Sequence, residues 1–110
     1  MMKVKSKVWI EEDGIPVFGE GREDLLELID THGSINKAAS SLGISYRKAW
    51  SYIKTMEETL KIPLVERSKG GIGGGGSRLT DEARSFLIRF DRLCKGIDEI
   101  VNERFKIVFK

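Results

Sequence analysis

Apolar side chains recur at helical spacing in four segments of the chain, which predicts four helices. The first predicted helix covers residues 20–32 and ends at Gly33, because glycine adopts the left-handed conformation of a helix C-cap at little cost. The second covers residues 35–42 and follows Ser34, a residue type that caps helix N-termini. Its alanines permit close approach of another helix. His32 is expected to be a helix-end residue without a catalytic or ligand role.

The third predicted helix begins after the break at Gly43 and runs to about Lys61, with Ser45 as its N-cap. Its apolar residues recur at intervals of four, three and four, which places them on one inward face. These inward residues are Ala49, Ile53, Met56 and Leu60. The remaining polar and basic residues of the helix are expected to point mostly outward.

The N-terminus has the period-two alternation of a strand. Over residues 3–10, Val4, Val8 and Ile10 fall on one face, and lysines alternate with them on the other. A turn signal follows at residues 12–14, and residues 15–18 offer a short returning strand. We therefore expect an N-terminal hairpin within residues 1–19.

Between residues 68 and 77 the chain carries six of its twelve glycines. Pro63 ends the third helix, residues 64–67 form a strand candidate, and residues 78–80 can return antiparallel to it. The glycines then form the tip of a hairpin, where Gly73 and Gly74 would let backbone N–H groups approach phosphates closely. Arg67, Lys69 and Arg78 would supply positive charge at its base.

A glycine-rich segment can also bind a nucleotide or act as a linker. Gly71, Gly73 and Gly76 satisfy the G-x-G-x-x-G pattern, but a dinucleotide site also needs a buried strand and a parallel crossover unit, for which this chain has no pattern. No Gly-Lys-Ser or Gly-Lys-Thr follows, so a phosphate-binding loop is disfavoured. A flexible linker between two independent parts is the remaining alternative.

The final predicted helix spans residues 81–105 and is capped by Thr80. Its apolar residues follow a heptad spacing, and a helix of that length exceeds what so small a body needs, so we expect it to pair with a second copy. The alternative is that the apolar stripe packs on the domain's own core. The residues assigned to the dimer interface are Phe86, Phe90, Leu93, Ile97 and Ile100.

Composition narrows the class of protein. The 110 residues, 40% hydrophobic and 33% charged, suit one globular domain over residues 1–110. No apolar run is long enough to span a membrane, and the start lacks the apolar stretch of a signal peptide, so we expect no membrane association and a cytoplasmic location.

Little in the sequence supports catalysis or metal binding. Cys94 is the only cysteine, which excludes an intrachain disulfide, and its apolar neighbours indicate a structural role. No serine, histidine and acid set with a recognisable spacing appears. We expect no enzymatic activity, no metal and no cofactor.

Charge is distributed unevenly despite a net charge of only +2. Residues 34–56 contain Lys37, Arg47, Lys48 and Lys54 and no acid, whereas acids gather on both sides of this segment. Two helices joined by a glycine-containing turn, the second one polar and basic at its start, form the helix-turn-helix arrangement that places a helix in the major groove of DNA. A helical hairpin with a solvated basic face is the plainer alternative.

The segments "GSINKAASSLGIS" (residues 33–45) and "LVERSKGGIGGGGSRLT" (residues 64–80) resemble the N-terminal DNA-binding domain of the ModE family of molybdate-responsive regulators, and more distantly the LysR-type winged helix. "ISYRKAW" (residues 44–50) and "GGIGGGG" are the more specific parts. The resemblance implies that Ser34, Asn36 and Lys37 contact phosphates. It implies that bases or nearby backbone are faced by Ser45, Tyr46, Arg47, Lys48 and Ser51. Trp50 is assigned either to packing against the wing or to direct contact with DNA.

The expected fold is mainly α with small β: a winged helix-turn-helix (residues 20–80) with the N-terminal hairpin and a long C-terminal dimerisation helix. The expected function is a dimeric, sequence-specific regulator that binds double-stranded DNA. An architectural DNA-binding module or a protein-interaction module is the alternative. The resemblance to the ModE family implies C-terminal domains that bind molybdate. This chain stops soon after its final helix. We therefore expect a stand-alone DNA-binding subunit, and leave open a separate oxyanion-sensing partner.

Overall fold

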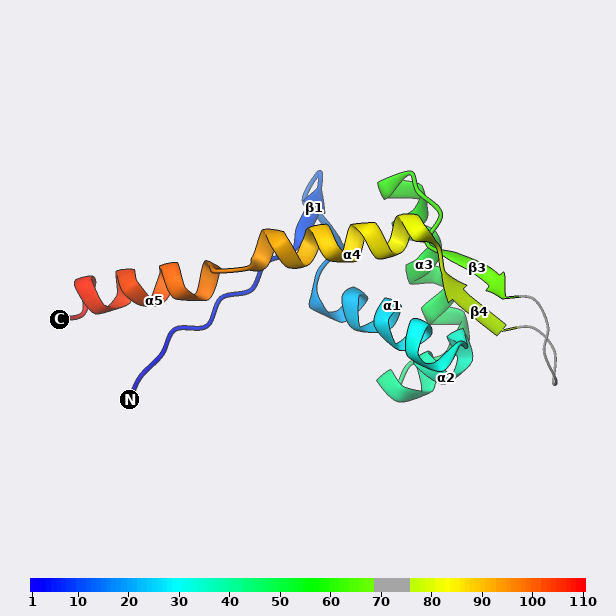
Figure 1. The fold of residues 1–110 in the computed structure, drawn as a ribbon, viewed down its shortest axis with the longest axis horizontal. Coiled ribbons are helices and arrows are strands. Elements are labelled where there is room, and N and C mark those ends of the chain that lie inside the picture. Colours follow the sequence, from blue (N-terminus) through cyan, green and yellow to red (C-terminus); the bar gives the residue numbers. More distant parts are fainter. Residues whose placement is uncertain (69–75) are drawn as a thin grey trace.

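The computed structural model describes residues 1–68 and 76–110, and in that part of the chain it contains five helices and two antiparallel hairpins. The molecule is elongated, 60 × 32 × 24 Å along its principal axes. Figure 1 shows the helices and hairpins in chain order. The elements are β1 (Ile10–Glu12), β2 (Ile15–Phe18), α1 (Glu20–His32), α2 (Ile35–Leu42), α3 (Tyr46–Leu60), β3 (Val65–Ser68), β4 (Gly76–Leu79), α4 (Asp81–Cys94) and α5 (Ile97–Val108).

Local sequence signals set the first three helices, as predicted. Ser34 accepts a hydrogen bond from the Lys37 N–H (3.1 Å) at the start of α2, and Ser45 accepts one from the Lys48 N–H (3.0 Å) at the start of α3. Gly33 has a positive φ of 66°, which ends α1 and turns the chain into α2. The short helix α2, the glycine turn and α3 form the predicted helix-turn-helix.

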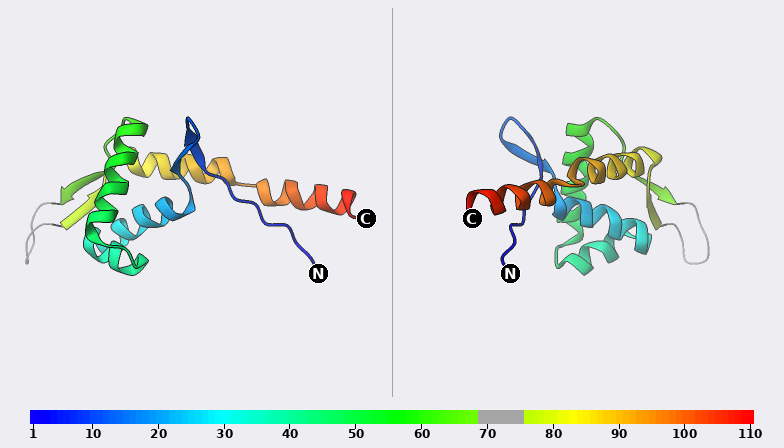
Figure 2. Two further views of the ribbon diagram at one scale, coloured as in Figure 1. Left: turned by 180° about the vertical axis from the view of Figure 1, so that it is seen from behind. Right: turned by 60° about the vertical axis from the view of Figure 1, so that its left-hand side comes forward.

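The second hairpin follows α3, with Val65 opposite Leu79 and Arg67 opposite Ser77. This β3–β4 hairpin, the wing, projects from the body beside the helix-turn-helix (Figures 1 and 2). The fold is therefore a winged helix-turn-helix with a mainly helical body. The predicted contact residues Lys69, Gly73 and Gly74 lie outside the described residues.

One phenylalanine from β2 joins the two ends of the domain. Phe18 is fully buried, and its ring meets the rings of Phe86 and Phe90 edge-on, each with a centroid separation of 4.8 Å. Phe90 is only 5% exposed. Phe90 therefore belongs to the domain's own core, and Phe86 packs against that core while staying partly exposed; their assignment to a dimer interface stays a prediction.

The predicted final helix over residues 81–105 is divided in two. α4 ends at Cys94, Gly96 has a positive φ of 85°, and α5 then continues to Val108. A left-handed residue cannot continue a right-handed helix, so the backbone hydrogen bonds restart after Gly96. The C-terminal helical segment is present, and Figure 1 shows α5 extending beyond the body in nearly the same direction as α4.

The N-terminal hairpin is present but shorter than predicted, because β1 begins only at Ile10. β1 has three residues and pairs antiparallel with the four residues of β2. Upstream, the chain is extended and binds α5 through side chains: the Val4 N–H donates to Asn102 Oδ1 (2.8 Å), and Asn102 Nδ2 donates to the Val4 carbonyl (2.7 Å). The alternation over residues 3–9 thus reflects an extended segment without a partner strand, and only Ile10 of the alternating run belongs to β1.

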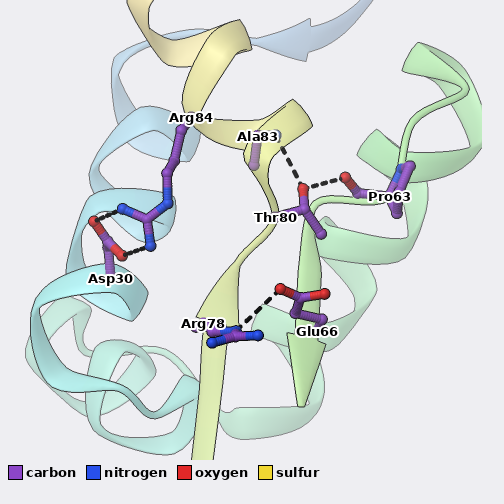
Figure 3. A network of polar contacts seen from close by, with 7 residues as sticks. All are labelled: Asp30, Pro63, Glu66, Arg78, Thr80, Ala83 and Arg84. Atoms are coloured by element: carbon purple, nitrogen blue, oxygen red, sulfur yellow. Dashed lines mark hydrogen bonds and ion pairs between the residues drawn. The ribbon is translucent and has the colours of Figure 1, made fainter. Parts of the chain in front are cut away.

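Thr80 connects the wing to α4. Its hydroxyl donates to the Pro63 carbonyl (2.6 Å) and accepts from the Ala83 N–H (3.0 Å), as Figure 3 shows. Its backbone N–H donates to the Leu64 carbonyl (3.0 Å), and the residue is 5% exposed. One buried residue thereby caps α4 and closes the base of the wing.

We expect Thr80→Val to lower the free energy of unfolding by about 1–3 kcal/mol, because the cap is lost and the Pro63 carbonyl is left without its donor. Urea unfolding followed by circular dichroism measures this. Thr55→Val, an exposed threonine of α3, is the matched control and should change stability by less than about 0.5 kcal/mol. Equal stabilities of the two variants would contradict the role of Thr80.

The segment along α5 should respond to pH through Asp98. The Ser6 hydroxyl and the Ser6 N–H (3.0 Å) both donate to Asp98 Oδ1. These hydrogen bonds, with a smaller effect of Lys5, lower the pKa of the Asp98 carboxyl from its ordinary value. Because the pKa is lower in the folded state, the ionised Asp98 carboxylate stabilises its contact with Ser6 above about pH 4. This stabilisation is lost as the pH falls through the lowered pKa and the carboxylate is protonated.

We therefore expect the Ser6 amide signal in NMR spectra to stay constant at neutral pH and to move toward its unfolded position on strong acidification. Asp98→Asn should abolish this titration, whereas Glu103→Gln, an exposed acid of the same helix, should leave it unchanged. A Ser6 signal that titrates normally in Asp98→Asn would show that another group controls this segment.

Candidate nucleic-acid interface

Helix α3 has two opposite faces. Ala49, Ile53 and Met56 are fully buried, which fixes how the helix is turned on the body. The opposite side of α3 is exposed, and its residues are spaced by four, three and four positions. We call this side the outer face; it consists of Arg47, Ser51, Lys54 and, at its C-terminal end, the acidic Glu58.

A groove separates α3 from the wing. It has a volume of about 570 Å³ and is open to solvent along one side. It brings the N-terminus of α2, the start of α3 and the base of the hairpin together. Its polar lining includes Ser34, Asn36, Tyr46, Trp50, Arg67, Ser77 and the acidic Glu66.

The predicted site residues therefore fall into two groups. Those of the first group, Ser34, Asn36, Tyr46 and Arg67, meet in the groove. The second group lies outside the lining of the groove, with all side chains exposed; it contains Lys37, Ser45, Arg47, Lys48, Ser51, Lys54 and Arg78.

Trp50 lines the groove together with the wing residues Val65 and Arg67, and it is 36% exposed. Its indole Nε1 donates a hydrogen bond to the hydroxyl of Tyr46 (2.6 Å), one helical turn earlier. Tyr46 is 49% exposed. The two rings thus form a pair at the edge of the groove, a relationship that the sequence assignment of Trp50 did not include.

The wing is attached to the helix-turn-helix through its backbone. The Ser77 N–H donates to the carbonyl of Gly33 (2.9 Å), at the turn between α1 and α2. Arg78 pairs with Glu66 directly across the hairpin (Nε to Oε1, 3.0 Å; Figure 3). The predicted positive charge of Arg78 is therefore partly balanced by Glu66, which leaves Arg67 as the described wing cation that lines the groove.

Two contacts that the sequence did not indicate hold this arrangement. Glu57 of α3 accepts hydrogen bonds at Oε2 from the N–H groups of Leu64 (2.7 Å) and Val65 (3.4 Å), where the chain enters β3. Arg84 of α4 pairs with both carboxylate oxygens of Asp30 of α1 (3.1 and 2.8 Å; Figure 3). Each contact joins separate elements, so periodicity gives no sign of it.

On the flank of α3 away from the wing, Tyr52 receives cations on its ring. The guanidinium of Arg22 lies 4.8 Å from the ring centroid, and the ammonium of Lys48 lies 5.9 Å from it. The charge of Lys48 is thereby held near the start of α3, beside the outer face.

Glu23 and Cys94 line another cavity, outside the groove. Burial, reinforced by Glu27 and Asp24, raises the pKa of Glu23, and burial together with Glu23 raises the pKa of the Cys94 thiol. A raised thiol pKa reduces the thiolate fraction, which fits a structural residue.

Among the described residues, no cluster of three or more His, Cys, Asp or Glu side chains suits a metal ion. No helix in that part of the chain has the length and apolar character needed to cross a membrane.

Comparison with known proteins identifies relatives of this arrangement. The family described as "Bacterial regulatory helix-turn-helix protein, lysR family" matches residues 24–84. The "Molybdenum-pterin-binding protein MopA" of Rhodobacter capsulatus is 37% identical over 84 residues, which cover 76% of this chain and 32% of that protein. The "Molybdenum transport protein ModE" of Azotobacter vinelandii is 34% identical over 106 residues, which cover 86% and 39%.

The "DNA-binding transcriptional dual regulator ModE" of Escherichia coli K12 is 40% identical over 74 residues, covering 67% of this chain and 28% of that protein. The chain thus spans about a third of the length of the curated relatives it matches.

Solved structures share the fold. The chain is similar to "Crystal structure of CbnR_DBD-DNA complex", with a TM-score of 0.59 and 20% identity, covering 82% of this chain and 97% of that one. It is also similar to "Crystal Structure of BenM_DBD/catB site 1 DNA Complex", with a TM-score of 0.55 and 24% identity, covering 80% and 92%. These likenesses establish the winged helix-turn-helix fold.

Glu57 offers a test of how the wing is held. We expect Glu57→Ala to lower the free energy of unfolding by about 1–3 kcal/mol and to increase amide exchange at Leu64, because two N–H groups lose a charged acceptor. Denaturant unfolding and hydrogen exchange measure the two effects. The adjacent exposed Glu58→Ala is the control, and an equal increase in exchange at Leu64 there would contradict the role of Glu57.

Proposed function

We propose that this chain, which belongs to the lysR family of bacterial regulatory helix-turn-helix proteins, is a transcriptional regulator that binds double-stranded DNA sequence-specifically as a dimer. The observation that carries the proposal is the outer face of α3. There Arg47, Ser51 and Lys54 stand on a helix whose other side is anchored in the core. A helix held in this way fits the major groove, and its exposed polar side chains can meet base edges.

We assign base contacts to the start and outer face of α3. Arginine can donate two hydrogen bonds to the O6 and N7 acceptors of guanine, which makes Arg47 the strongest candidate for discrimination between bases. Ser45, Tyr46, Lys48 and Ser51 are assigned to bases or adjacent backbone, and Lys54 extends the positive surface along the helix.

We assign phosphate contacts to the groove and the wing. The N-terminus of α2 presents backbone N–H groups with partial positive charge, and Asn36 and Lys37 lie in its first turn. Arg67 adds charge from the wing. The same assignment extends to Ser34, Lys69, Gly73, Gly74 and Arg78, although Glu66 balances part of the charge of Arg78.

The dimer would form through the outer stripe of the C-terminal helices. Leu93, Ile100 and Ile107 recur every seven residues and are 52%, 69% and 71% exposed. α5 has no buried residue, and a free helix of its length is only marginally stable in water, so it gains from a partner. Ile97 is half-buried and lies at the edge of this stripe. Two copies would present two α3 helices to a roughly palindromic site.

Several relatives are named for molybdenum or DNA-binding regulation. We extend to this chain only their regulatory use of DNA, and propose that any oxyanion signal reaches it through an oxyanion-sensing domain or partner. We assign no catalytic step to the protein.

Selection of binding sites from random duplex DNA at about physiological salt tests the function as a whole. Nonspecific contacts are weak at that salt concentration, so a base-specific protein should enrich one two-fold symmetric sequence. Recovery of unrelated sequences with binding retained would replace the proposal with an architectural DNA-binding role. Absence of binding would favour a protein-interaction module.

Two arginines should separate base recognition from backbone binding. We expect Arg47→Ala to reduce discrimination between the selected site and its single-base variants by about 1–3 kcal/mol. Arg67→Ala should weaken binding to all duplexes similarly and reduce the salt dependence by about one unit of slope. Fluorescence anisotropy titrations over a range of salt concentrations measure both. A uniform loss in Arg47→Ala, with site preference intact, would contradict its assignment.

The dimer surface is tested by paired charges on the exposed stripe. The double variant Leu93→Asp, Ile100→Asp should sediment as a monomer in analytical ultracentrifugation, because two apolar contacts become carboxylates that repel their symmetry mates. Ile15→Asp, an exposed isoleucine of the N-terminal hairpin, is the control and should sediment as the unmodified chain does. A dimer that persists in the double variant would exclude these helices from the interface.

A further inference from the structure

The hydrogen bond between Trp50 and Tyr46 fixes which role the tyrosine hydroxyl can take. An indole N–H only donates, so the Tyr46 oxygen must accept in the 2.6 Å contact with Trp50 Nε1. The proton of the hydroxyl then remains to be donated elsewhere. Among the residues that the structure describes, none accepts that proton.

The position of the pair directs this proton toward the interface. Tyr46 is the first residue of α3, where side chains of a helix in the major groove meet base edges and neighbouring phosphates. Tyr46 and Trp50 both line the groove between α3 and the wing, opposite Arg67 and Asn36. A donor at this place faces the side of the molecule that we assign to DNA.

We propose that Trp50 is a positioning residue, which holds the Tyr46 hydroxyl as an oriented hydrogen-bond donor for an acceptor oxygen or nitrogen on the DNA. The inference rests on the proposed DNA-binding function and deepens it. The acceptor belongs either to a phosphate or to a base edge, since both present the same chemistry to a phenolic donor.

Pre-organisation is the physical benefit of the arrangement. A free tyrosine hydroxyl rotates and acts as donor or acceptor, so it discriminates poorly between the two kinds of partner. Once Trp50 occupies the oxygen, a DNA donor such as an exocyclic amine meets an acceptor that is already engaged. The fixed ring also loses less rotamer freedom on binding than a mobile side chain would.

The experiment is a double-mutant cycle on DNA binding. Trp50→Phe keeps an aromatic ring and removes the N–H, and Tyr46→Phe removes the hydroxyl. We expect each variant to bind the selected duplex about three- to tenfold more weakly, and the double variant to bind no more weakly than Tyr46→Phe alone. Trp9→Phe is the matched control: Trp9 also donates through its indole, to Glu11 (2.6 Å), but lies outside the groove.

Duplexes with single-base changes distinguish the two acceptors. A uniform loss in Trp50→Phe across all duplexes supports a phosphate acceptor, and a loss of preference at one base pair supports a base acceptor. A further loss when Trp50→Phe is added to Tyr46→Phe would overturn the inference, because Trp50 would then act on DNA directly or through the fold. Unchanged binding in either single variant would also overturn it.

Fluorescence provides a readout that is independent of affinity. The chain contains two tryptophans, so Trp9→Phe leaves Trp50 as the only indole emitter. In that background we expect Tyr46→Phe to shift the Trp50 emission, and DNA to alter it. An emission that ignores Tyr46→Phe would show that the indole bond is not formed in solution. If the unmodified chain binds no duplex, the proposed function fails, whereas normal binding in Trp50→Phe rejects only the positioning role.

Discussion

The burial of Phe18 is the interaction on which the arrangement of the domain depends. Phe18 comes from β2, near the start of the chain, and meets Phe86 and Phe90 of α4, near its end. Burying an aromatic side chain contributes roughly 1.5–3 kcal/mol, and each edge-on ring pair adds about 0.5–1.5 kcal/mol. These contacts lay α4 across the body with its apolar stripe inward. The outer residues of the C-terminal helices are therefore free of the core and available to another surface.

Three hydrogen-bonded connections then fix the position of the wing relative to α3. Thr80 closes the base of the hairpin against the chain that leaves α3, Gly33 accepts the Ser77 N–H, and Glu57 holds the entry to β3. Each connection has a backbone group on at least one side, and none uses a side chain of the outer face of α3. The position of the wing is therefore independent of the residues on that outer face. The outer face of α3 can accordingly vary in sequence while the groove beside it keeps its dimensions.

The sequence was sufficient where the determinants are local. Caps at Ser34, Ser45 and Thr80 and the left-handed Gly33 and Gly43 define helix ends within a few residues, and the structure confirms them. It was insufficient where partners are distant. Nothing near Phe90 indicates that Phe18 covers it, and no pattern connects Asp30 with Arg84 or Glu57 with Leu64.

In two places a regular sequence pattern extends past the end of a structural element. The heptad spacing continues through Gly96, so apolar periodicity alone could not show that its backbone adopts a positive φ. The alternation before Ile10 is that of a strand, but an extended segment becomes one only beside a backbone partner, and here side chains of α5 take that place. For the candidate site, residue types and exposure were predictable, whereas the pairing of Arg78 with Glu66 and of Trp50 with Tyr46 required the structure.

The attachment of the N-terminal segment to α5 has a consequence for how the protein can be tethered. Because Val4 and Ser6 are bound to Asn102 and Asp98, both ends of the chain lie at the same end of the molecule, and the wing lies at the other (Figures 1 and 2). A module joined to either terminus would start from the pole remote from the groove. A domain attached at either terminus could therefore be accommodated without covering the groove.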